Sequence, residues 1–240
     1  MEEVTVPPPA GLVFYGVRGV ETLYIFPILL FSIVVHEVAH GWLALKLGDP
    51  TASDMGRLTL NPLPHIDPVG SVLVPLISYF AAGTVFIAWA KPVPINPANF
   101  RNVRRDDILV SIIGPVANFL LALLCVVLTV ITQMAFPSTD LIASGVGYEA
   151  VSFLKNTFTA GIPLNIFLAV FNLIPVPPLD GSHVVASLLP EKIANAYRQV
   201  GFAGILLIII LMRLAPVQHA VLGAVHYILT PYVFLLHLFQ

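Results

Sequence analysis

Two histidines and a glutamate lie within five consecutive apolar-flanked residues, His36-Glu37-Val38-Ala39-His40. Histidines four apart on a helix project from one face, so both imidazoles can bind one metal ion. Glu37 lies beside them, where it can reach a water molecule at that metal. The pattern HExxH therefore predicts a zinc hydrolase. The alternative is a pair of buried histidines with a carboxylate counter-ion.

A zinc ion in a hydrolytic site usually has three protein ligands and a water molecule, so a third ligand is required. The remaining carboxylate inside an apolar stretch is Asp180, which follows a run from Asn172 that contains three prolines. Helices broken inside a membrane occur where the freed backbone groups face protein or a water-filled cavity. Asp180 is therefore the candidate third ligand, and His183 is a rival ligand or a hydrogen-bonding partner.

The composition excludes a water-soluble globule. Of 240 residues, 58% are hydrophobic and 10% are charged, whereas soluble domains are about 45–50% apolar and about 25% charged. Eleven Lys and Arg against thirteen Asp and Glu give a net charge of −2, which provides no basic field for nucleic acid. Cys125 is the single cysteine, so no intramolecular disulfide is possible.

The apolar stretches predict an all-α polytopic membrane protein with about six transmembrane helices, one of them broken at the proline-rich motif. The stretches cover 23–45, 69–90, 108–135, 160–189, 200–212 and 214–239. Their connections are too short to fold in water. We therefore expect one transmembrane domain over 1–240, with a core at about 23–190 that carries the candidate metal ligands and additional helices at about 195–239.

Two features of the topology remain open in the sequence. Residues 69–90 contain Pro75 and Gly83, so this stretch either crosses or re-enters. The histidines and Asp180 reach one depth most simply if their helices run in the same direction, which requires an even number of reversals between them. If all six stretches cross, seven of the eleven Lys and Arg lie on one side, which places both termini in the cytosol.

A short segment near 89–100 is predicted to be extended or re-entrant. In Trp89-Ala-Lys-Pro-Val-Pro-Ile-Asn-Pro a proline recurs at every second or third position. Proline removes a backbone donor and breaks helices, so the segment suits an edge strand or a loop.

Three motifs in this order resemble the site-2 protease family of intramembrane zinc metalloproteases. They are the HEVAH sequence at 36–40, Gly114-Pro-Val-Ala-Asn118, and the run from Asn172 to Gly181. The resemblance covers roughly residues 31–181 and includes the proline-rich segment. It implies a minimal form of the family without an accessory soluble domain.

The resemblance implies specific roles for the site residues. His36, His40 and Asp180 would hold one zinc ion, and Glu37 would act as general base. Asn172, eight residues before the aspartate, would lie in the active site, where its carboxamide can donate to the oxyanion. Zinc lowers the pKa of bound water and polarises the scissile carbonyl, so these groups together suit peptide hydrolysis.

The same resemblance implies a transmembrane protein as substrate within the lipid bilayer. A peptide bond in a helix is shielded, so the substrate must unwind, and the proline-rich segment can receive it by strand addition. Lys91, Val93 and Ile95 are the expected substrate-binding residues. We expect an integral, multi-pass protein in the plasma membrane of a bacterium or archaeon, since the N-terminus does not resemble a signal peptide. A homo-oligomer is compatible with the sequence.

The HExxH motif and the other polar residues also have alternative interpretations. Prenyl-protein endopeptidases also use HExxH, and a transporter or ion-binding protein could hold a buried His/Asp metal site. Gly114 and Asn118, four apart, favour a close helix contact with an interhelical hydrogen bond. His65 is expected in a turn. Three histidines in the last stretch fall on one helix face and are expected to form a packed or interfacial polar face: His219, His226 and His237.

Overall fold

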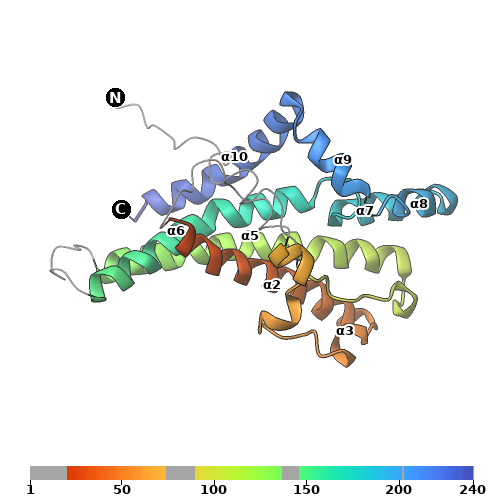
Figure 1. The fold of residues 1–240 in the computed structure, drawn as a ribbon, viewed down its shortest axis with the longest axis horizontal. Coiled ribbons are helices and arrows are strands. Elements are labelled where there is room, and N and C mark those ends of the chain that lie inside the picture. The colour runs from red at the N-terminus through yellow and green to blue at the C-terminus, as the bar shows by residue number, and fades with distance from the viewer. Residues whose placement is uncertain (1–20, 74–89, 137–145, 202, 240) are drawn as a thin grey trace.

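The structure is a computed structural model that describes residues 21–73, 90–136, 146–201 and 203–239. These residues form helices and loops and no strand, which confirms the all-α prediction (Figure 1). The four long helices are α2 (Glu21–Leu47), α5 (Val103–Ala135), α6 (Val146–Asn172) and α10 (Ala215–His237). The short helices are α3 (Thr51–Asp54), α7 (Asp180–Leu188), α8 (Glu191–Arg198), α9 (Ala203–Leu211), the 3-10 helices η1 (Leu63–His65) and η3 (Pro97–Asn99), and the π-helix η2 (Pro68–Leu73).

Four helices in the described part of the chain are long and apolar enough to cross a membrane. They are Ile25–Leu47, Val103–Ala135, Gly147–Asn172 and Ala215–His237. Helices α8 and α9 meet at an angle of 81° and would add a fifth span if they form one broken crossing. Most of the predicted stretch at 69–90 lies outside the described residues. The short α7 cannot span a membrane, since its nine residues rise only about 14 Å.

Helices α2, α5 and α6 pack side by side at the centre of the fold, and α5 runs opposite to the other two (Figure 1). Later residues of α2 contact earlier residues of α5: His36 contacts Asn118, and His40 contacts Val110. The two helices are therefore antiparallel. The chain between α2 and α5 therefore begins and ends at the same end of the bundle. Helices α2 and α6 run in the same direction, the arrangement that most simply brings the histidines and Asp180 to one depth.

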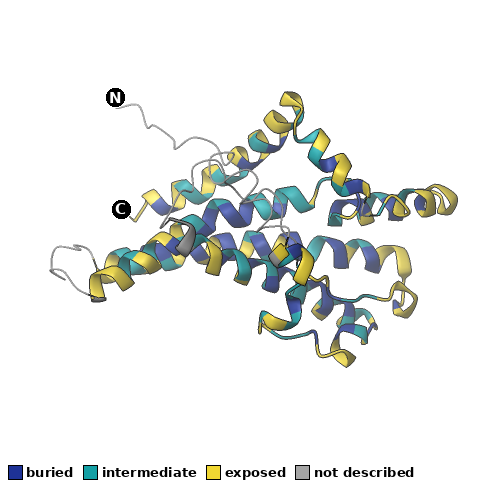
Figure 2. Ribbon diagram, viewed as in Figure 1, coloured by how far each residue is buried: buried dark blue, intermediate teal, exposed yellow. Residues whose placement is uncertain are grey.

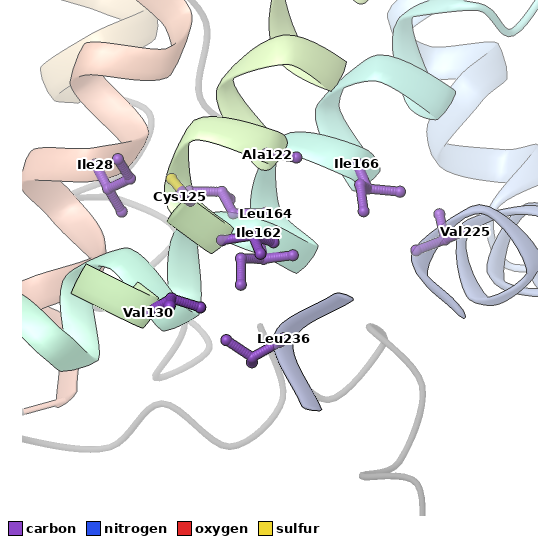
Figure 3. Close-up of a cluster of buried hydrophobic side chains, with 10 residues drawn as sticks. Ile28, Ala122, Cys125, Val130, Ile162, Leu164, Ile166, Val225 and Leu236 are labelled. Atoms are coloured by element: carbon purple, nitrogen blue, oxygen red, sulfur yellow. The ribbon is translucent and has the colours of Figure 1, made fainter. Parts of the chain in front are cut away.

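The apolar core lies where α5 and α6 meet α2 and α10 (Figure 3). Gly161 allows this close packing, because a Cβ atom there would lie 2.6 Å from Cys125 Sγ and 2.9 Å from Ile28 Cγ1. Buried residues follow the facing sides of these helices, and exposed ones follow the outer sides (Figure 2). Large apolar residues such as Leu120 and Leu206 are exposed on the outside, as expected of surfaces that contact lipid.

The proline-rich motif ends α6, and α7 then continues along α5 in the same direction, since Asp180 lies near Gly114 and Ser187 contacts Asp107. Helix α6 begins at Val146, well before the expected residue 160, since charged residues such as the exposed Glu149 are tolerated where a helix extends beyond hydrocarbon. It ends at Asn172, and α7 begins at Asp180. A Cβ atom at Gly181 would collide with the Leu173 carbonyl oxygen, so glycine permits the close return of the chain.

Candidate active site

His36, His40 and Asp180 come together at the junction of α2 and α7. One ligand atom from each lies within 4.8 Å of the other two. The Nε2 atoms of the histidines are 3.0 Å apart, and Asp180 Oδ2 lies 3.1 Å from His36 Nε2 and 3.4 Å from His40 Nε2. Ligand atoms around a tetrahedral zinc ion lie about 3.3 Å from one another. The spacing of these donor atoms therefore fits zinc.

The hydrogen bonding around these three residues also fits a cation. Asp180 Oδ2 is buried and has no hydrogen-bond partner among the residues that the structure describes. The histidines use their Nδ1 atoms elsewhere and turn their Nε2 atoms toward this oxygen. A buried carboxylate oxygen without a donor is costly unless a positive charge compensates it. Two imidazoles and a carboxylate are the ligand types that zinc prefers in hydrolases.

The orientation of each histidine is fixed by helix α5. His36 Nδ1 donates to Asn118 Oδ1 at 2.6 Å, and His40 Nδ1 donates to the Val110 carbonyl oxygen at 2.6 Å. A proton held on Nδ1 leaves the lone pair of Nε2 for a metal. Asn118 in turn donates to Asn165 Oδ1 at 3.0 Å, and Asn165 donates to the Gly161 carbonyl oxygen at 2.9 Å. A chain of buried amides on α5 and α6 thus supports His36.

Helix α5 approaches the histidines this closely because residue 114 is glycine. A Cβ atom on Gly114 would collide with His40 Nε2 and would lie 2.6 Å from His36 Cε1. The expected helix contact and interhelical hydrogen bond at Gly114 and Asn118 are both present. The sequence analysis missed the partner, since Asn118 bonds to a histidine of the HExxH motif. The four-residue spacing from Gly114 was the available signal.

Glu37 lies between the histidines in sequence and contacts the proline-rich segment. Its Oε2 atom accepts a hydrogen bond from the Val93 backbone N–H at 2.7 Å. Residues 90–96 form neither helix nor strand, in agreement with the loop expected there. Of the residues expected to bind substrate, Lys91 is exposed, Val93 is buried, and Ile95 packs against a small apolar cluster around Phe100.

Asn172 is the last residue of α6. Its Nδ2 atom donates to the Leu168 carbonyl oxygen at 3.0 Å, one turn earlier in the same helix. Within the described ranges, it has no hydrogen bond to the histidines of the motif or to Asp180.

His183 lies apart from the three grouped residues. Its Nδ1 atom is 3.5 Å from Asp107 Oδ1, and its side chain is 48% exposed. Asp107 also accepts a hydrogen bond from Ser187 Oγ at 2.9 Å and lies 3.7 Å from Arg198 Nη2. This buried carboxylate, which the sequence analysis did not single out, connects α5 to α7 and α8.

The other histidines have contacts of a simpler kind. His65 is buried in η1, as the turn reading predicts, and its Nε2 atom donates to the Thr59 carbonyl oxygen at 3.0 Å. His219, His226 and His237 are exposed along α10.

Comparison with known proteins decides the family. Residues 100–212 match the model of Peptidase family M50. A Bacillus subtilis protein named "Putative zinc metalloprotease YwhC" is 37% identical over 188 residues, which are 78% of this chain and 79% of that protein. The chain belongs to peptidase family M50. This membership confirms the resemblance to site-2 proteases.

Two further relatives of this M50 protein come from mycobacteria and carry the name "Putative zinc metalloprotease Rip2". The Mycolicibacterium smegmatis protein is 30% identical over 76% of this chain and 64% of its own length. The Mycobacterium tuberculosis H37Rv protein is 32% identical over 63% of this chain and 52% of its own length. No solved structure matches the chain.

Family membership establishes the type of protein. The M50 protein is a zinc metalloendopeptidase, its substrates are proteins, and its apolar helices make it an integral membrane protein. Zinc is its cofactor, which agrees with the donor atoms gathered at His36, His40 and Asp180. The transporter and prenyl-protein endopeptidase alternatives are set aside by this membership.

Proposed function

We propose that this M50 enzyme hydrolyses peptide bonds in or near transmembrane segments of membrane proteins, as in regulated intramembrane proteolysis. One observation carries the proposal: His36 and His40 are buried within the candidate membrane span Ile25–Leu47. Ionisable residues at such a depth are costly and mark functional sites. A catalytic group inside the apolar layer is directly accessible to a substrate that is itself embedded there.

In this proposal His36, His40 and Asp180 hold the zinc ion, and Glu37 is the general base. When bound there, zinc would polarise the scissile carbonyl and activate a water molecule for attack. Glu37 takes a proton from the attacking water and delivers it to the leaving amine. Glu37 Oε2 already accepts the Val93 N–H. The other carboxylate oxygen, Oε1, is therefore the one that accepts the proton of the attacking water.

Asn172 and the proline-rich segment complete the proposed site. Asn172 stabilises the oxyanion by exchanging the Leu168 carbonyl oxygen for the substrate oxygen. A substrate unwound from its helix lies along the segment and contacts it at Lys91, Val93 and Ile95. The exposed side chain of Lys91 is directly available to it.

We further propose that the enzyme resides in the plasma membrane of a bacterium or archaeon. The named relatives come from bacteria.

The proposed function is tested by comparing cell membranes that contain the wild-type enzyme with membranes that contain Glu37→Gln. New protein N-termini are labelled and identified by mass spectrometry in both. We expect cleavage sites that occur only with the wild type and that map to transmembrane segments or within a few residues of them. Zinc content measured in the purified variant should equal that of the wild type. Identical N-termini in both membranes, or wild-type sites confined to soluble proteins, would refute the proposal.

A further inference from the structure

Polar contacts attach residues 91–99, here called the bracket segment, to the rest of the chain at both ends of the segment. At its first end, the Lys91 backbone N–H donates to the His65 carbonyl oxygen at 2.9 Å. Arg57 Nη2 donates to the Lys91 carbonyl oxygen at 2.9 Å and lies 3.4 Å from that of Pro92. The first end is thus fixed to the loop that follows α3.

The other end of the bracket segment is fixed by a buried carboxylate. Asp49 is completely buried just beyond the end of α2. Its Oδ2 atom accepts from the Asn96 backbone N–H at 2.7 Å, and its Oδ1 atom accepts from Asn99 Nδ2 at 2.7 Å. Between these two anchors, the Val93 N–H donates to Glu37 Oε2 at 2.7 Å.

The bracket segment lies directly against α2 because residue 41 is glycine. Gly41 is one helical turn after Glu37, on the same face. A Cβ atom at Gly41 would lie 2.8 Å from Val93 Cγ1 and 2.7 Å from Leu58 Cδ2. Any larger residue would push Val93 outward, away from Glu37.

Among the described residues, the hydrogen bonds of the Arg57 side chain go to the bracket segment. Its side chain is buried, and within the described ranges it makes no ion pair with a carboxylate. Its Nε atom is buried and has no hydrogen-bond partner in the described part of the chain. Burying a guanidinium group is costly unless it gains strong hydrogen bonds. The acceptors of Arg57 are carbonyl oxygens of the bracket segment. The buried guanidinium group therefore holds that segment in place.

We propose that the bracket segment positions the general base: the Val93 N–H fixes one oxygen of Glu37, and Arg57 and Asp49 hold the segment in place. The inference rests on the proposed function, in which Glu37 takes the proton. A carboxylate fixed through one oxygen presents the other in a single direction, whereas an unfixed one samples several rotamers. Misplacement by about 1 Å can reduce a rate by about 100-fold.

The first test removes the Val93 N–H and compares the effect with removal of the Val93 side chain. Val93→Pro deletes the donor, and Pro92 and Pro94 already impose an extended backbone on either side. Val93→Ala keeps the donor. On a membrane substrate found by the N-terminal comparison, we expect Val93→Pro to lower kcat about 10- to 100-fold with KM within about threefold. Val93→Ala should mainly raise KM.

Equal kcat values for Val93→Pro and Val93→Ala would overturn the inference, and so would a higher kcat for Val93→Pro.

Arg57 provides a second pair of variants, measured with the same substrate. Arg57→Gln should lower kcat, and Arg57→Lys, which keeps a cation at the Lys91 carbonyl oxygen, should recover part of it. A loss of kcat that is the same in both Arg57 variants and is accompanied by zinc loss would mean that Arg57 has only a structural role.

A second measurement needs neither substrate nor activity. Hydrogen–deuterium exchange of the zinc-loaded enzyme in detergent reports the Val93 amide within peptides that cover the bracket segment. Glu37→Ala should increase early exchange there by about one deuterium, since one acceptor is removed. No increase would overturn the inference. Full cleavage by Glu37→Gln would refute the proposed function itself, whereas an inactive Glu37→Gln with an unaltered Val93→Pro would refute only this inference.

Discussion

His36 and Asn118 are joined by a buried hydrogen bond of 2.6 Å between Nδ1 and Oδ1. The bond connects a histidine of α2 to the middle of α5, and Asn118 extends it to Asn165 on α6. Three separate helices therefore determine which nitrogen of His36 faces Asp180. Such outer partners fix the tautomer and the ring orientation of metal-binding histidines.

Replacing Asn118 by Leu should weaken zinc binding about 10- to 100-fold, the usual effect of losing a hydrogen-bond partner of a ligand. His36 would then lose the acceptor that holds its proton on Nδ1. Competition with a fluorescent zinc chelator measures the affinity. Cys125→Ala is the matched control, because it removes a buried side chain from the same helix without touching the histidines. Equal affinities of Asn118→Leu and Cys125→Ala would contradict the expectation.

Replacing Gly114 by Ala should abolish stoichiometric zinc binding. The added methyl group would collide with His40 Nε2 and would lie 2.6 Å from His36 Cε1, so α5 must move or the imidazoles must turn. Zinc per chain is measured by elemental analysis after purification in detergent. Gly223→Ala on α10 is the control, since apart from its own helix backbone and adjacent residues, no described part of the chain comes within 4 Å of a Cβ atom there. A normal zinc content in Gly114→Ala would show that the helices separate without disturbing the ligands.

Asp180→Ala should lose zinc, and His183→Ala should keep it. Asp180 lies beside the two histidines, whereas His183 pairs with Asp107. The same elemental analysis, with His36→Ala as a reference for loss, distinguishes the two candidates for the third ligand. Zinc retained in Asp180→Ala but lost in His183→Ala would reverse the assignment.

We expect the free energy of unfolding to depend on pH at acidic pH because of Asp49. Burial raises the pKa of its carboxyl, but hydrogen bonds from Thr51, Asn99 and Asn96 outweigh burial and bring the pKa below its usual 3.8. A group with a lowered folded-state pKa stabilises the protein above its unfolded-state pKa, about 3.9. That contribution disappears as the pH falls through the folded-state pKa.

The comparison of wild type with Asp49→Asn tests this linkage. The difference in thermal stability should be constant above about pH 5 and should shrink below about pH 4. Thermal unfolding in detergent over a pH series provides the measurement. A stability difference that stayed constant into strong acid would mean that the charge of Asp49 contributes nothing.

The features that the sequence predicted correctly depend on short-range periodicity or on composition. Helical spacing places His36 and His40 on one face, whatever surrounds them. Long apolar stretches predicted the helices α2, α5 and α10 with bounds close to those observed, because hydrocarbon thickness sets their length. The early start of α6 was missed, since Glu149 and Lys155 interrupt the apolar pattern there.

Other relationships join residues that are far apart in the chain, and no local pattern encodes them. Asp180 and His183 lie three apart on α7, and both were candidates for the third ligand. The proline-rich motif after Asn172 places Asp180 beside the histidines, while Asp107 on α5 pairs with His183.

The sequence by itself therefore determined the chemistry available to this protein: the HExxH motif, a membrane-depth carboxylate and the apolar helices that carry them. Only the tertiary structure decided which groups meet, including Asn118 with His36 and Val93 with Glu37. The physical reason is one of range. Periodicity fixes directions within one helix, whereas contacts between helices depend on close approach, which here is permitted by glycines at 41 and 114.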